Sequence, residues 1–79
     1  MNDYESPNIY EASYYAFCGI PPLLKFLDSG LIVFVFRYER IRSLLHDFNN
    51  NKPVPVTEYV KHIRALRSKM HSLKEAQNG

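Results

Sequence analysis

The stretch DSGLIVFVF (residues 28–36) decides the fold, because six apolar residues directly follow a tight-turn signal. A strand with one solvent-exposed face should alternate apolar and polar residues, and this run does not alternate. A three-residue loop that ends in Gly30 is typical of a hairpin closed by a left-handed residue. The sequence therefore predicts a β-hairpin with strands over residues 23–27 and 31–37.

The loop length also fixes the register of this hairpin. The predicted pairs are Leu27 with Leu31, Phe26 with Ile32, Lys25 with Val33, Leu24 with Phe34, and Leu23 with Val35. Because side chains alternate along a strand, the core face should hold Leu24, Phe26, Ile32, Phe34 and Phe36. The second face should hold Leu23, Lys25, Leu27, Leu31, Val33 and Val35. Apart from one lysine, this second face is also apolar.

Helical patterns flank the hairpin on both sides. Ser6-Pro7 predicts a helix over residues 7–18, with Ser6 as N-cap, and Gly19 should end it. Its aromatic stripe of Tyr10, Tyr14 and Phe17 is expected in the core. A second helix is predicted over residues 39–48. Thr57 should cap a third over residues 57–74, whose apolar seam is Tyr59, Ile63, Leu66, Met70 and Leu73.

These elements predict one α+β domain over residues 1–79, built as a helix, a two-stranded antiparallel hairpin and two helices, with residues 1–5 and 75–79 frayed. The apolar run is too short to span a membrane, and the first residues do not resemble a signal peptide. We therefore expect a cytoplasmic protein with no membrane partner. A net charge of +2 is too small to imply any partner.

The runs IYEASYYAFCGI and LLKFLDSGLIVFVF, followed by two helices, resemble a small prokaryotic family of unknown function. The resemblance spans residues 9–73 and implies the same helix, hairpin and two closing helices, together with an association with phage, plasmid and archaeal genomes. This chain departs from the family pattern at Leu31, Ile32 and Val33, where the family tends to be polar. The matching positions are Tyr10, Ala12, Ser13, Tyr14, Gly19, Leu23, Leu24, Gly30, Phe34, Val35, Phe36, Asn49, Ile63, Leu66 and Arg67.

No pattern in the sequence indicates catalysis. Cys18 could act as a nucleophile only beside a histidine, and nothing in the sequence brings one to it, so a buried apolar thiol is the simpler interpretation. The histidines, His46, His62 and His71, lack the spacing of metal ligands, and the carboxylates are scattered. We therefore expect no enzyme, no cofactor, no metal and no small-molecule substrate.

The third helix is a candidate for nucleic-acid contact through Lys61, Arg64, Arg67 and Lys69. Its cations ring the helix instead of forming one stripe, however, and nucleic-acid binders usually concentrate them on one face. A solvated helix with cations suited to its dipole is the simpler alternative.

The second face of the hairpin is the stronger candidate, because monomers rarely expose a large apolar patch. Helices could cover it, another protein could dock on it, or a second copy could pair with the hairpin edge to edge. Lys25 argues against complete burial within one chain. We therefore predict a homodimeric or partner-binding interaction module, an inhibitor or adaptor from a phage or mobile element. Val33→Glu is expected to break the association and leave the fold intact.

Overall fold

The predicted hairpin is confirmed in the computed structural model, which describes residues 2–78 and the side chains of residues 2–77. Strands β2 (Leu23–Phe26) and β3 (Ile32–Arg37) pair antiparallel in the predicted register, from Phe26 opposite Ile32 to Leu23 opposite Val35. Gly30 closes the turn with a φ of 91°, which glycine adopts readily.

A third strand, β1 (Asp3–Ser6), pairs antiparallel with the other edge of β3, so the sheet order is β1-β3-β2. The predicted two-stranded sheet is therefore wrong, as is the fraying predicted for residues 3–5. Residues 1 and 79, also predicted to fray, lie outside the described part. The physical reason for the extra strand is that β3 would otherwise leave one row of backbone N–H and C=O groups unpaired.

Helix α1 (Ile9–Phe17) begins after Asn8, whose side-chain oxygen accepts the backbone N–H of Tyr10 at 2.9 Å. The predicted N-cap at Ser6 is therefore wrong, because Ser6 ends β1. The predicted end is confirmed: Gly19 has a φ of 95°, and its N–H donates to the Ala16 carbonyl at 2.9 Å. The N–H of the following residue, Ile20, donates to the carbonyl of Tyr15, which completes a Schellman motif.

Helix α2 (Tyr38–Asn49) follows β3 directly, and α3 (Val56–Asn78) is the longest element. The carbonyl of Pro55, directly before α3, accepts the N–H of Tyr59 at 3.0 Å. Thr57 therefore lies inside the first turn, and its predicted role as N-cap is wrong. The helix also continues beyond its predicted end at residue 74.

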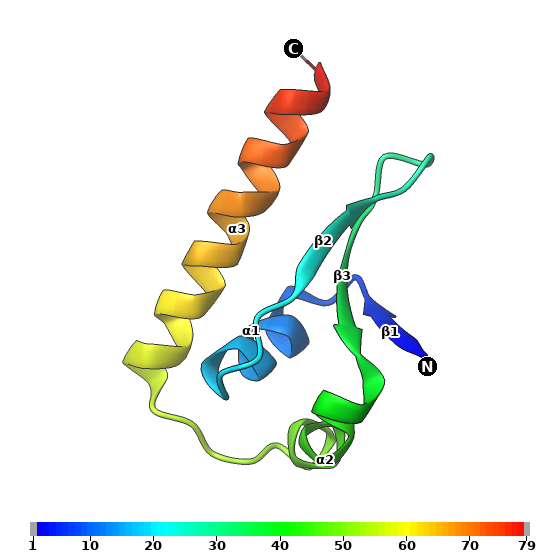
Figure 1. Cartoon of the computed structure of the whole chain (residues 1–79). Helices are drawn as coiled ribbons and strands as arrows, with labels where there is room; N and C mark the ends of the chain where they lie inside the picture. The colour runs from blue at the N-terminus through cyan, green and yellow to red at the C-terminus, as the bar shows by residue number, and fades with distance from the viewer. Residues whose placement is uncertain (1, 79) are drawn as a thin grey trace.

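All three helices lie on one side of the sheet, with α1 in the middle of the group (Figure 1). The core consists of Phe34 and Phe36 from β3 packed with residues of all three helices: Ala12, Tyr14, Tyr15, Ile41 and Leu66. Tyr10, predicted to be in the core, is 53% exposed. Tyr15 is buried in the core instead, and its ring contacts that of Phe36 edge to face, with ring centroids 5.0 Å apart. Among residues 2–78, no helix is both long and apolar enough to cross a bilayer.

Candidate interaction surfaces

The side of the sheet opposite the helices forms a surface that we call the open face. It consists of Asp3 and Glu5 from β1, Leu23 and Lys25 from β2, and Val33, Val35 and Arg37 from β3, as the register requires. Most of these side chains are exposed, and Leu23 is 76% exposed. This is the second face that the sequence predicts, widened by the acidic strand β1.

An ion pair crosses the centre of the open face. The Lys25 ammonium lies 3.1 Å from the Glu5 carboxylate, and the pair bridges β2 and β1 over β3. Val33 sits beside this bridge and is only 5% exposed. The prediction that Val33→Glu would leave the fold intact is therefore wrong, because it would place a charge at a buried position.

The remaining residues of the predicted second face lie toward the two ends of the sheet. Leu31, 50% exposed, and the half-buried Leu27 lie where the hairpin turns. At the opposite end, Leu23 and the half-buried Val35 border a hollow of about 370 Å³. The hollow is lined by Asp3, Ile20, Pro21, Leu23, Val35, Phe36, Arg37 and Arg40. An exposed leucine thus stands at the rim of a hollow that carries both apolar walls and charges of both signs.

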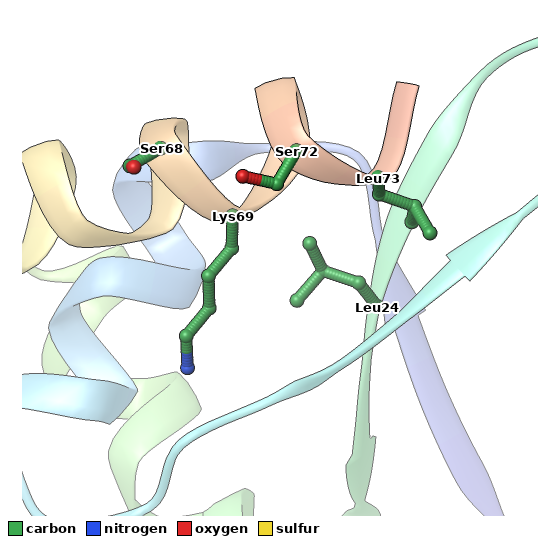
Figure 2. A pocket seen from close by; sticks show the side chains of 5 residues that line it. All are labelled: Leu24, Ser68, Lys69, Ser72 and Leu73. Carbon is green, nitrogen blue, oxygen red and sulfur yellow. The ribbon is translucent and has the colours of Figure 1, made fainter. Parts of the chain in front are cut away.

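A shallow groove of about 450 Å³ lies between α3 and β2. Figure 2 shows Leu24 on β2 below the helix and Leu73 on α3, with Ser68, Lys69 and Ser72 along the same helix. The groove forms because α3 runs beside the hairpin (Figure 1), and its helical lining residues all lie within the predicted range of the helix. The sequence places Leu73 in the apolar seam, but it gives no sign of this groove.

The basic residues of α3 do not gather on one side. Lys61, Arg64, Arg67 and Lys69 are all exposed, and Lys61 pairs with Glu58 at 3.5 Å. Lys69 borders the groove beside β2. Arg67 instead borders a separate hollow of about 370 Å³ near the start of α1, lined by Pro7, Ile9, Arg67, Met70, His71 and Lys74. The four predicted residues therefore do not form a single phosphate-binding surface.

Glu11 forms a buried polar cluster that the sequence does not reveal. Its carboxylate accepts hydrogen bonds from the hydroxyls of Tyr4 at 2.5 Å, Ser6 at 2.7 Å and Tyr15 at 2.7 Å. Burial, and then the hydrogen bond to Glu11, raise the pKa of Tyr4 to about 12, and the same two causes raise the pKa of Tyr15. None of the hollows described above is lined by Glu11. We therefore interpret the cluster as a structural link between β1 and α1.

Cys18 is exposed, in contrast to the buried thiol that the sequence predicts. His62 reaches the neighbouring Phe17, with ring centroids 6.1 Å apart, but within residues 2–78 no hydrogen bond joins the Cys18 thiol to a histidine. In the same part of the chain, no group of three His, Cys, Asp or Glu residues is arranged to hold a metal ion.

No family model matches the chain, and neither a curated protein nor a solved structure matches it.

Proposed function

We propose that this chain is a small, non-enzymatic protein-interaction module that self-associates through the open face of its sheet. One observation carries the proposal: Leu23 is 76% exposed at the rim of a hollow that Asp3, Val35 and Arg37 of the open face also line. A surface with an exposed side chain next to a hollow is self-complementary, because a two-fold axis can place each Leu23 in the hollow of the other copy.

The charges around the hollow fit the same arrangement. Its rim carries one carboxylate, from Asp3, and two guanidinium groups, from Arg37 and Arg40. A two-fold axis parallel to the strands would bring the acidic strand β1 of one copy over strand β2 of the other, which carries Lys25. Opposite charges across an interface set the register and suppress wrong partners more than they add affinity.

The expected association is weak. Complete burial of an exposed leucine contributes about 2 kcal/mol, or about 4 kcal/mol for the two copies. Association itself costs about 4–15 kcal/mol in lost freedom of motion. Leu23 therefore needs the added contacts of Val35, Ile20 and Pro21 to produce a dimer at all.

Sedimentation velocity over a range of concentrations tests the proposal. The wild type should shift from monomer to dimer as concentration rises, and Leu23→Glu should remain monomeric. Val56→Glu is the matched control, because Val56 is 73% exposed and lies at the start of α3, away from the sheet. A monomer at every concentration, or equal behaviour of the two variants, would contradict self-association through this face.

The resemblance to a prokaryotic family of unknown function supplies no activity of its own. It supports only the finer proposal that the module is an inhibitor or adaptor carried by a phage or mobile element. Such a role requires a second protein as target, in addition to the second copy.

Nucleic-acid binding is the second candidate function, and the hollow near the start of α1 favours it. Arg67, His71 and Lys74 border this hollow together. If phosphates bind there, affinity should fall steeply as salt rises, and Arg67→Glu should weaken binding more than Lys69→Glu. Fluorescence anisotropy with labelled single-stranded and double-stranded DNA measures both effects. Absence of binding at low salt would exclude this function.

A further inference from the structure

Strand β2 has a free edge, and its backbone groups there can be assigned from the hairpin. The N–H of Leu27 donates to the carbonyl of Leu31 at 2.8 Å, so the N–H of Leu27 points across the hairpin toward the second strand. In an antiparallel ladder hydrogen-bonded pairs alternate with unbonded ones, so Lys25 also bonds to β3. The N–H and C=O groups of Leu24 and Phe26 therefore point away from the sheet. The opposite side of β3 is already taken by β1, so β2 carries one of the two free edges of the sheet.

The groove under α3 lies along this same strand. Its apolar floor consists of Leu24 and Leu73, and its helix side carries two serines, Ser68 and Ser72, both exposed (Figure 2). Because serine side chains are short, space remains between α3 and the region just outside β2. A strand added to β2 would lie in the plane of the sheet and would direct every second side chain into this space.

Lys69 gives this groove a positive charge. It is exposed and projects from α3 into the space above β2 (Figure 2). Among the residues that line the groove, Lys69 is the only charged one, so the groove contains no carboxylate to match it. An occupant that carries an acidic residue beside an apolar one would complement both Lys69 and the Leu24–Leu73 floor.

We propose that the edge of β2 and the groove under α3 bind an extended, acidic segment of another protein by strand addition. Main-chain hydrogen bonds to Leu24 and Phe26 would supply affinity, and the groove would select the side chains, as in other cases of strand addition. This site is separate from the open face, so each can be tested without the other.

A second copy fits this edge less well. Two β2 strands related by a two-fold axis must pair about one residue. If that residue is Lys25, the two Lys25 side chains face each other; if it is Leu24 or Phe26, Lys25 faces Leu23 or Leu27 of the other copy. In each register the two grooves contribute two Lys69 side chains and no carboxylate. Like charges directly opposite each other are destabilising.

The test uses the full chain and a phage-displayed library of random short peptides. Enriched peptides should alternate apolar and other residues and carry an acidic residue. Ser72→Phe, which fills the groove, should weaken their binding by about tenfold or more. Lys69→Glu should weaken it by about fivefold. Ser43→Phe on α2 and Arg64→Glu on the far flank of α3 are matched controls at exposed positions, and both should bind as the wild type does.

Amide hydrogen exchange provides a readout of the backbone contact itself. In the free chain the amides of Leu24 and Phe26 should exchange quickly, and a synthetic copy of the best peptide should protect both. Four results would overturn the proposal: no enriched peptide, equal binding to Ser72→Phe, a peptide that leaves both amides unprotected, or concentration-dependent protection in the free chain. The last result would assign the edge to a second copy. Sedimentation of Leu23→Glu remains a separate test of the open face.

Discussion

Replacement of Glu11 by alanine should destabilise the fold by about 3–5 kcal/mol. Glu11 is 6% exposed, and its carboxylate accepts three hydroxyl hydrogen bonds of 2.5–2.7 Å. A hydrogen bond to a charged group contributes about 1.5–3 kcal/mol, and three bonds to one carboxylate contribute less than three times that value because they are not independent. Alanine would also leave the hydroxyls of Ser6 and Tyr15 buried without an acceptor.

The destabilisation expected for Glu11→Ala would be a large fraction of the free energy of unfolding. At about 0.05–0.15 kcal/mol per residue, a chain of 79 residues has a free energy of unfolding of about 4–12 kcal/mol. Glu11→Gln keeps the side-chain volume and one carbonyl oxygen, so it should cost less, about 1–2 kcal/mol. The order of stability should therefore be wild type, Glu11→Gln and then Glu11→Ala.

Urea unfolding followed by circular dichroism measures these differences. Glu39→Ala is the matched control, because Glu39 is also an acidic residue in the first turn of a helix but is exposed. It should lose only the interaction with the helix dipole, about 0.3–1 kcal/mol. If Glu11→Ala costs no more than Glu39→Ala, the carboxylate is not the link between β1 and α1 that its geometry indicates.

Three further predictions concern stability. Because burial and the bond to Glu11 raise the pKa of Tyr4 to about 12, while an unfolded tyrosine titrates near 10, the unfolded state loses its proton first. Stability should be complete below pH 10 and fall as pH rises from about 10 to 12; urea midpoints that stay constant over this range would contradict this. Ser13→Ala should raise the thermal midpoint by removing a buried hydroxyl that has no hydrogen-bond partner among residues 2–78, a gain of about 1 kcal/mol; a lower midpoint would show that the hydroxyl is satisfied. Val33→Glu should lower the urea midpoint strongly, whereas Leu23→Glu should leave it nearly unchanged; equal effects would contradict the difference in exposure between the two side chains.

The sequence was sufficient for the hairpin and its register, because Asp28-Ser29-Gly30 allows one loop type and the flanking residues then pair without ambiguity. The end of α1 at Gly19 followed for the same reason, since the backbone there needs a left-handed residue. Strand β1 could not be found in this way. Asp3, Glu5 and the half-buried Tyr4 give no apolar alternation, and the strand forms because β3 offers it an edge.

The candidate surfaces were harder to predict than the fold. The register placed Leu23, Lys25, Val33 and Val35 on one face as predicted, but the sequence did not reveal that Val33 is buried or that Glu5 reaches Lys25 from the unpredicted strand. The Glu11 cluster joins residues of two elements, and its one signal in the sequence was the spacing of four between Glu11 and Tyr15 on the same helical face. The groove depends on how α3 and β2, which are far apart in the sequence, lie beside each other, and no short pattern encodes that arrangement.

The most direct test of the open face is an isotope-filtered NMR experiment on an equal mixture of labelled and unlabelled chains. If each Leu23 enters the hollow of the other copy, its methyl groups should show contacts between copies to Val35 and Ile20. These contacts should disappear on dilution. A dimer without such contacts, or a chain that remains monomeric at the concentration of the experiment, would contradict self-association through the open face.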